Sequence, residues 1–524
     1  MTLQGFFVAG PYDDGDPVTG HYYETASNDA TRAQVWGYTD ALSYAPGDVL
    51  SLHAMSSADR ARVTILCDGA APAVVHDTVV ATRFAETPAD CAVRGCGWPV
   101  VLTLTIPMDW TSGVYRVALT IEGHQSDHMF VLRAGAVRRP ILMLLTTGTW
   151  CAYNDWGGSN HYQGLTGPRQ TDAAAEVSLH RPWARGFVGW PDGAPRIPHA
   201  SPLLTRPRYP HMEYARARGI SKKYASSGWA AFERPFALWC AAQGIALDYA
   251  TQHDLHRDPA LLDGYDRVLI AGHDEYWTWE MRDHLEAWVD RGGHLARFAG
   301  NMFWQTRLSD DLLTQTCHKT APDPCTDPRR RTTYWDHPQV ARPAVATMGL
   351  TGAMGVYAGW SRCAAHGSGG FTIYRPDHWA LQDSGLGYGD VLGAQARIFA
   401  YEVDGIDYTM TQGLPFAAPG TGMQGDLTII ALSPATTLSH DTGPHDRDLF
   451  IGHLDAEDVA REVYGAVTPE TLGRASRGNG CMVDYRRGAG AVFNAGSCEW
   501  VNGLITHEPT VERVTRRVLR GEWA

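Results

Sequence analysis

The chain has 524 residues, of which 44% are hydrophobic and 19% are charged, and this composition excludes intrinsic disorder and fibrous repeats. The formal net charge of -13 argues against a protein that binds phosphates, so we expect no nucleic-acid partner. No stretch approaches the ~20 apolar residues of a membrane span, and the first residues lack the basic and apolar regions of an export signal. We therefore expect no membrane association and a cytoplasmic location.

The N-terminal part of the chain alternates short β-rich runs with turns and shows no helical periodicity. Strands at this spacing predict an antiparallel sandwich of the immunoglobulin-like type. We assign residues 1–137 to this all-β domain, with a linker near 134–140. The runs that carry the prediction are VLSLHAM, ARVTILCDG, VVLTLTI, GVYRVALTI and HMFVLRA.

The remainder of the chain, residues 138–524, alternates apolar strands with amphipathic helices. The runs ILMLLTT, IALDYAT, DRVLIAG and HLARFAG predict strands, and 230–243 and 280–291 predict helices. This alternation is typical of a parallel sheet covered on both faces, and we expect a doubly wound, flavodoxin-like core. Long loops at 159–228 and 306–370 interrupt it, a β-rich part follows from residue 397, and 510–520 predicts a terminal helix.

The ten cysteines are expected to be reduced, because the chain is long and lacks an export signal. Cys91 and Cys96 form a pair without the second cysteine or histidine pair of a zinc finger, which favours two thiols over a structural zinc. Cys151 follows a predicted strand, but no nucleophile elbow surrounds it, so cysteine catalysis is disfavoured.

Polar residues follow two predicted strands, at the edge of the sheet where ligands bind in this class of fold. His273 and Glu275 are two residues apart, so an extended backbone places both side chains on one side, where they could serve as a base and a metal ligand. Asn301 follows the next strand and could stabilise an oxyanion. A helix cap or a surface contact is the structural alternative for these residues.

A third predicted strand leads to two tyrosines, Tyr153 and Tyr162, that flank the Gly157-Gly158 turn. Glycine permits the chain to fold back at such a turn and to bring both phenols to one point. The structural alternative for each tyrosine is a buried ring whose hydroxyl is hydrogen-bonded.

Taken in order, these motifs resemble the large (beta) subunit family of N,N-dimethylformamidase. The resemblance covers about residues 85–520. It rests on Asp109-Trp110-Thr111-Ser112-Gly113-Val114-Tyr115, Ala152-Tyr153-Asn154, His161-Tyr162-Gln163-Gly164 before Arg181-Pro182, Gly272-His273-Asp274-Glu275-Tyr276, Ala299-Gly300-Asn301-Met302-Phe303-Trp304 and Tyr401-Glu402-Val403-Asp404.

The resemblance implies a mononuclear non-haem iron, as Fe³⁺, in a domain with the fold of class I glutamine amidotransferases. The implied metal ligands are Tyr153, Tyr162 and Glu275. His273, Asn301 and Glu402 are the implied catalytic residues, and Glu402 rests on the shortest match.

The function that the resemblance implies is hydrolysis of the C–N bond of a small N-substituted amide, such as N,N-dimethylformamide, by iron-activated water. Two alternatives stay open: a hydrolase of the same fold that acts on a larger or cyclic amide or another C–N bond, and a non-catalytic ligand-binding protein. We expect the chain to lack the additional N-terminal lectin-like region of the family, which leaves the small-subunit partner open, and a homo-oligomer is also compatible with the sequence.

Overall fold

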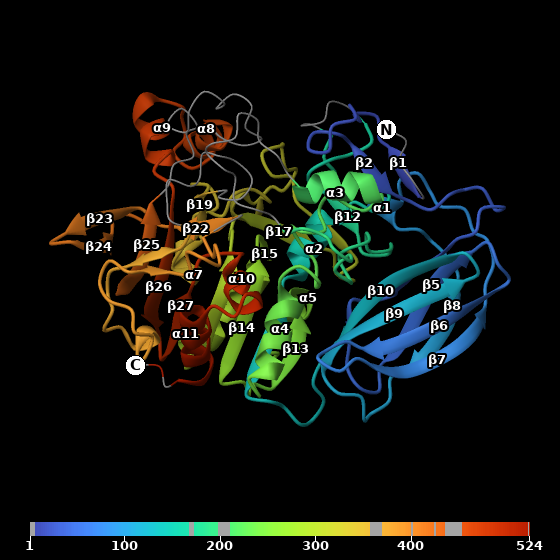
Figure 1. Cartoon of the computed structure of the whole chain (residues 1–524). Coiled ribbons are helices and arrows are strands. Elements are labelled where there is room, and N and C mark those ends of the chain that lie inside the picture. The colour runs from blue at the N-terminus through green and yellow to red at the C-terminus, as the bar shows by residue number, and fades with distance from the viewer. Residues whose placement is uncertain are drawn as a thin grey trace. The chain divides into compact units, whose positions relative to one another are not determined.

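The computed structural model describes residues 6–166, 172–196, 210–356, 369–399, 402–423, 426–434, 453–521 and 523 (Figure 1). The chain divides into two compact units. Unit 1 comprises Met1–Arg196, His211–Asp258 and Arg307–Ala321, and unit 2 comprises Ile197–Pro210, Pro259–Thr306 and Pro322–Ala524. The predicted boundary between residues 137 and 138 stays a prediction.

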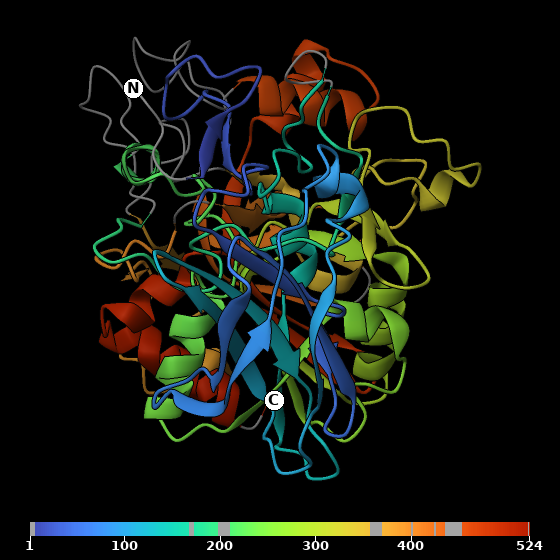
Figure 2. The ribbon, with the colours of Figure 1, turned by 90° about the vertical axis from the view of Figure 1, so that its right-hand side faces the viewer.

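Unit 1 contains a β-rich N-terminal region of two sheets. One sheet has the order β4-β10-β9-β6-β7 and the other β3-β5-β8, and all pairs are antiparallel except β4 with β10. Figure 2 shows these strands in blue and teal. The strands are β3 (Val35–Thr39), β4 (Ser43–Tyr44), β5 (Val49–Ser56), β6 (Arg60–Cys67), β7 (Ala73–Ala81), β8 (Val100–Thr105), β9 (Gly113–Ile121) and β10 (His124–Leu132).

The two sheets share one apolar core because inward residues of both contribute to it. Leu50 and Leu52 come from β5, and Val63, Val117 and Phe130 come from the other sheet. The five β-rich runs of the sequence are therefore confirmed as strands. The strand β7 was not predicted, and its side chains are mostly exposed, so it lacks the alternating pattern that a half-buried strand shows.

A parallel strand pair lies later in unit 1. It consists of β11 (Ile141–Leu145) and β13 (Leu247–Thr251). A short helix, α2 (Thr147–Tyr153), follows β11, and α4 (Glu233–Ala242) precedes β13, within the helix predicted over 230–243. The other elements are β1 (Phe7–Ala9), β2 (Tyr22–Glu24), α1 (Cys91–Arg94), β12 (Glu176–Ser178), α3 (Pro210–Arg218), α5 (Gln252–Arg257) and β18 (Thr314–Thr316).

The strands of unit 2 follow one another in a mixed sheet, in the order β14-β16-β27-β26-β25-β20-β21. The first three are parallel to one another and the rest are antiparallel. Their bounds are β14 (Arg267–His273), β16 (His294–Gly300), β20 (Phe371–Ile373), β21 (Val391–Leu392), β25 (Leu427–Pro434), β26 (Asn479–Arg487) and β27 (Gly490–Asn494).

Helices connect and follow the parallel strands of unit 2. The predicted helix over 280–291 is α6 (Trp279–Asp290), which joins β14 to β16, and the predicted terminal helix is α11 (Pro509–Arg520). The other elements are β15 (Tyr276–Thr278), β17 (Trp304–Leu308), the 3-10 helices Pro328–Arg330 and Trp379–Leu381, α7 (Val345–Met348), β19 (Thr351–Val356), β22 (Val403–Gly405), β23 (Tyr408–Thr411), β24 (Leu414–Ala417), α8 (His453–Glu462), α9 (Pro469–Ala475) and α10 (Trp500–Ile505).

The fold is therefore mixed α/β, with a β-rich N-terminal region. The expected all-parallel sheet is too simple, because β25 and β26 turn the C-terminal half of the unit 2 sheet antiparallel. Of the described helices, none combines the length and the apolar character that crossing a membrane requires. Nine cysteines lie in the described ranges and all are free thiols, among them the buried Cys91 and Cys96.

Candidate active site

Two neighbouring parallel strands of unit 2 end side by side. Strand β14 ends at His273 and β16 at Gly300, and these two residues are partners in the register of the pair. The backbone N–H of Asp274 donates to the carbonyl of Gly300 over 3.1 Å, which ties the two strand ends together. The residues that follow, Glu275 and Asn301, are consequently neighbours, as the carboxyl ends of parallel strands predict.

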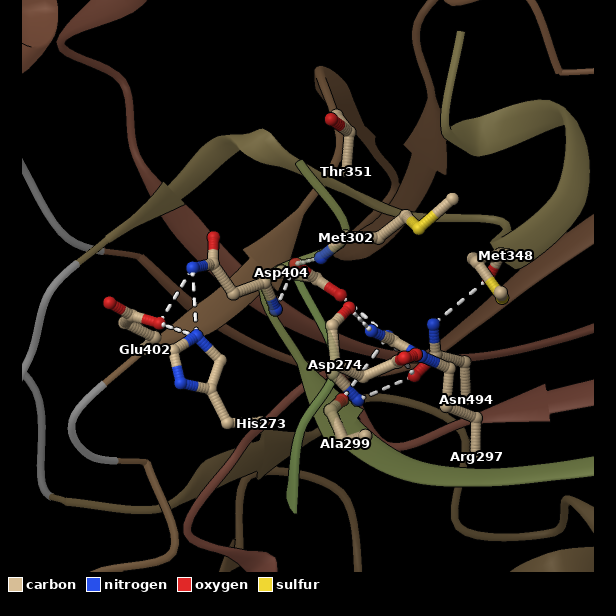
Figure 3. Close-up of polar contacts among 12 residues, drawn as sticks. His273, Asp274, Arg297, Ala299, Met302, Met348, Thr351, Glu402, Asp404 and Asn494 are labelled. Atoms are coloured by element: carbon tan, nitrogen blue, oxygen red, sulfur yellow. Dashed lines mark hydrogen bonds and ion pairs between the residues drawn. The ribbon is translucent and has the colours of Figure 1, made fainter. Parts of the chain in front are cut away.

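His273 lies at the centre of a buried group of polar side chains (Figure 3). Its Nε2 atom contacts the Oε2 atom of Glu402 and lies 3.2 Å from Oε2 of Glu275. The side-chain amide of Asn301 donates from Nδ2 to Glu402 Oε2 over 2.6 Å, and Nδ2 lies 3.2 Å from His273 Nε2. No member of the group is more than 4% exposed. Four of the six residues singled out in the sequence therefore meet in unit 2.

The electrostatics of this group favour a charged imidazole. Burial lowers the pKa of His273, but the charges of Glu402 and Glu275 and their hydrogen bonds outweigh that effect and raise it to about 10. These contacts favour an imidazolium between two carboxylates. The attraction between the opposite charges offsets part of the free-energy cost of burying each of them.

Asn301 adopts a backbone conformation that side chains rarely take, with a φ of 69°. The helix-cap alternative for Asn301 is wrong, because the strand β17 follows it. Strand β19 passes close by, where a Cβ atom on Gly352 would lie only 2.7 Å from Oδ1 of Asn301. A glycine at position 352 is therefore needed for this approach.

Glu275 is held by both of its oxygens. The indole N–H of Trp304 donates to Oε1 over 2.8 Å, while Oε2 faces His273. The backbone N–H groups of Phe303 and Trp304 donate to the carbonyl of Glu275 over 3.2 and 2.9 Å. The carboxylate is thus oriented by the chain that follows β16.

The two tyrosines form a pair within unit 1. Tyr153 ends α2, and Tyr162 follows the Gly157-Gly158 turn, where both glycines have a positive φ. The hydroxyl of Tyr162 donates to that of Tyr153 over 3.0 Å, and the ring centroids are 4.6 Å apart. The prediction that this turn brings the phenols together is confirmed.

Two of the three lysines of the chain lie over these rings. The Nζ atom of Lys223 is 5.2 Å from the centroid of Tyr153 and 4.7 Å from that of Tyr162. Lys319 lies over Tyr162 at 3.1 Å from its centroid. A cation above a phenol ring is attracted to its π-face and also favours negative charge on the oxygen.

Cysteine chemistry finds no support at Cys151. Its side chain is buried in α2, and burial raises the pKa of the thiol to about 12, although the charge of Arg181 opposes this. A thiol held un-ionised is a poor nucleophile.

A further potential ligand that was not predicted from the sequence, Cys498, lies beside His273. In the described part of the chain, His273, Glu402 and Cys498 present donor atoms that all lie within 4.8 Å of one another, so this buried group could hold a metal ion. Cys498 follows β27, the third parallel strand of unit 2, and its backbone N–H donates to the carbonyl of Glu402 over 3.1 Å. Recognising GAVFNAG as a strand next to HLARFAG would have pointed to it.

Three charged residues that were not predicted as site residues also adjoin the group. Arg297 lies inside an apolar strand, and Asp274 and Asp404 stand beside the residues that were singled out. Tyr401, which was part of one matching motif, lies outside the described residues.

Comparison with known proteins gives one family. A family model described as "N,N-dimethylformamidase beta subunit-like, C-terminal" matches residues 68–512. The N,N-dimethylformamidase beta subunit of an Alcaligenes species is 28% identical over 227 residues, and that of Paracoccus aminophilus is 27% identical over 227 residues. Each alignment covers 41% of this chain and 28% of the relative, so the matched part spans less than a third of the length of these relatives.

Proposed function

This chain belongs to the N,N-dimethylformamidase beta subunit-like family, and from that premise we propose that it is a hydrolase of a small N-substituted amide such as N,N-dimethylformamide. The observation that carries the proposal is the buried contact of His273 with Glu275, Asn301 and Glu402. An acid, two carboxylates and an amide donor are suited to the general acid–base catalysis and oxyanion stabilisation that support cleavage of a C–N bond.

Each side chain has a role that its contacts support. The amide of Asn301 carries two N–H donors, of which one bonds Glu402; the other faces Nε2 of His273, which cannot accept it when protonated, so this donor is suited to the substrate carbonyl oxygen. The imidazolium of His273 is suited to deliver a proton to the departing amine, which leaves poorly without one. The carboxylate of Glu402 contacts that imidazolium and balances its positive charge. Because both side chains are buried away from water, this electrostatic attraction is stronger than it would be at the surface.

We propose Tyr153, Tyr162 and Glu275 as the ligands of a mononuclear iron, as Fe³⁺. The donor set fits this ion, because phenolate and carboxylate oxygens are hard anionic donors. The two phenol oxygens are 3.0 Å apart in unit 1, and lysines lie over the rings. A bound ferric ion would supply Lewis-acid polarisation of the carbonyl and would acidify water.

The charges of unit 2 also favour a cation. Six buried ionisable side chains gather there, and if Arg297 and His273 are both charged they carry two positive charges against four carboxylates. The set is His273, Asp274, Glu275, Arg297, Glu402 and Asp404. A net charge of about -2 in a region shielded from water is costly, and a multivalent cation offsets it.

The group of His273, Glu402 and Cys498 is the rival ligand set. A thiolate ligand favours softer metals than Fe³⁺, and the two sets are distinguished by substitution. We expect Tyr162→Phe and Glu275→Ala to lower the iron content of the purified protein, and Cys498→Ser to leave it unchanged. Tyr115→Phe, which alters a buried tyrosine of the sandwich, is the matched control.

The test begins with elemental analysis and a visible spectrum of the purified chain. About one iron per chain with a phenolate-to-iron charge-transfer band supports the proposed ligands. If Cys498→Ser loses the metal and Tyr162→Phe keeps it, the tyrosine assignment is overturned.

Activity is then tested on a panel of amides. Hydrolysis of small N-substituted amides in preference to aryl and cyclic ones supports the proposed substrate class. Preference for the larger amides would indicate a related hydrolase with a different substrate. Binding without turnover of any amide would indicate a ligand-binding protein.

The finer features of the fold are part of the proposal. The paired sheets of unit 1 are consistent with an immunoglobulin-like sandwich, since Tyr115 donates from its hydroxyl to the carbonyl of Thr111 over 2.7 Å, as in the tyrosine corner of such domains. The parallel strands are consistent with a flavodoxin-like, amidotransferase-like core.

Because the relatives are named subunits, we also propose an assembly, either with a small subunit or of copies of this chain, and light scattering of the purified protein tests it.

A further inference from the structure

Arg297 occupies the middle of strand β16 and is completely buried together with two carboxylates. Its Nε atom donates to Oδ2 of Asp274 over 2.8 Å, and its Nη1 atom donates to Oδ2 of Asp404 over 2.6 Å. Nη1 also lies 3.3 Å from Oδ1 of Asn494 and 3.2 Å from the carbonyl of Ala299. Figure 3 draws these contacts. One guanidinium therefore joins two carboxylates and the end of its own strand.

Each carboxylate stands beside the proposed reacting groups. Asp274 lies between His273 and Glu275 in the sequence, and Asp404 follows Glu402 by two residues. The second oxygen of Asp274 accepts from the indole N–H of Trp277 over 2.7 Å, so this side chain is fixed at both oxygens. Movement of Asp274 would therefore displace both of its neighbours.

Asp404 reaches the third group, Asn301, through the backbone. Its Oδ1 atom accepts from the N–H of Asn301 over 2.7 Å and from the N–H of Met302 over 3.1 Å. These bonds hold the turn at which Asn301 has a φ of 69°, a conformation that is unfavourable for a non-glycine residue without such support. Arg297 fixes the other oxygen of the same carboxylate.

We infer that Arg297, Asp274 and Asp404 form a positioning network that holds His273, Asn301 and Glu402 in contact with one another. The inference rests on the proposed function. A role in stability alone is the rival explanation, but a buried ion network is a weak source of stability, because desolvation offsets its attraction. The residues of this network instead bond to, or lie within two positions of, His273, Asn301 and Glu402.

The network acts on geometry, so its loss should lower kcat more than it raises KM. Displacement of reacting groups by about 1 Å costs about 10²-fold in rate. We expect Asp404→Asn to lower kcat about 30-fold or more and to change KM less than about threefold. Arg297 keeps its ion pair with Asp274 in this variant, so the chain should fold. Arg297→Lys keeps the positive charge but loses the planar guanidinium that bonds both carboxylates. It should therefore lower kcat to the same extent.

Arg282 provides the matched control. It is also completely buried, in α6, and donates to Oγ1 of Thr347 and to the carbonyls of Arg342 and Pro343 over 2.8 to 2.9 Å. Arg282→Lys should lower Tm as much as Arg297→Lys and leave kcat within about twofold. The inference is overturned if Asp404→Asn keeps wild-type kcat, or if Arg282→Lys loses kcat in proportion to its Tm.

A crystal structure of Asp404→Asn gives an outcome that does not depend on activity. The one oxygen of an asparagine amide cannot accept both from Arg297 and from the N–H groups of Asn301 and Met302, so we expect Asn301 to leave its positive φ and its amide to lose contact with Glu402. An unchanged Asn301 would refute the network. A wild-type chain that hydrolyses no amide would refute the proposed function instead, and the crystal structure would then decide the inference alone.

Discussion

The sandwich of unit 1 and the strand ends of unit 2 are buried in opposite ways. The sandwich core consists of apolar side chains such as Leu52, Val63 and Phe130, whose removal from water stabilises the fold. In unit 2, His273 at the end of β14 and Arg297 in the middle of β16 are buried among carboxylates, and taking each charge out of water costs free energy. The comparison teaches that burial has two uses here: the first region gives stability, and the second gives a preorganised polar site at the expense of stability.

The largest effect should come from His273→Ala. We expect kcat for the best amide to fall about 10³-fold, because proton delivery contributes 10²- to 10⁴-fold in enzymes. The Tm should also fall, since the variant leaves the buried carboxylates of Glu275 and Glu402 without their cationic partner, so kcat is compared per folded molecule. Steady-state kinetics and a thermal melt measure both quantities. Wild-type kcat in this variant would contradict the proposed role.

The converse change is Leu52→Ala in the sandwich. Leu52 is completely buried, and truncation of such a side chain destabilises by about 3 kcal/mol. Urea unfolding should show this loss, while kcat per folded molecule stays at the wild-type value. A loss of kcat in the folded variant would show that the two regions are not separable in this way.

A smaller effect on turnover is expected for Asn301→Ala. Loss of one oxyanion donor costs about 10²-fold in kcat. The iron content should remain that of the wild type, because Asn301 is not a proposed ligand. Elemental analysis beside the kinetic assay distinguishes this role from metal binding, and loss of iron would contradict it.

The smallest effect concerns a carboxyl of unit 1, Glu233, which is buried and has no cationic partner within the described ranges. It accepts from Oγ1 of Thr146 and from Nε1 of Trp150, its Oε2 atom has no hydrogen-bond partner among the residues that the structure describes, and burial raises its pKa to about 8. The folded state therefore binds a proton that the unfolded state has released, so the free energy of unfolding falls as pH rises from about 4.5 to about 8.

Glu233→Gln should remove this dependence. Relative to the wild type, the variant should gain at least about 1.4 kcal/mol between pH 5 and pH 8, which corresponds to one pKa unit. Urea unfolding at both pH values measures the difference. An equal effect of the substitution at both pH values would show that Glu233 is ionised in the fold.

Local patterns of the sequence predicted the elements well and their pairing poorly. The strand HLARFAG and the helix after residue 279 coincide with β16 and α6, because their periodicity reports burial directly. The antiparallel β26 was not predicted, since strand direction depends on partners distant in the sequence. The turn at Tyr153 and Tyr162 was foreseen because Gly157-Gly158 is a local signal.

The polar side chains of the site also differ in whether a local pattern or only a contact between distant segments identifies them. His273, Glu275 and Asn301 were found from their positions after predicted strands, and Glu402 from a resemblance alone; contacts in the folded chain join all four. Arg297 was missed because one charge in an apolar strand is normally read as exposed, whereas here two distant carboxylates keep it buried. Cys498 is brought to His273 only by the folded chain.

Because the chain has only three lysines, labelling of lysine side chains can be specific to one position. All three ammonium groups of the chain lie over tyrosine rings, with Lys222 over Tyr22 and the other two over the pair of Tyr153 and Tyr162. Lys222 and Lys223 are buried, while Lys319 is only partly covered. An amine-reactive dye should therefore label Lys319 first among the side chains. The label would then lie next to Tyr153 and Tyr162, although the reagent itself has no specificity for this site.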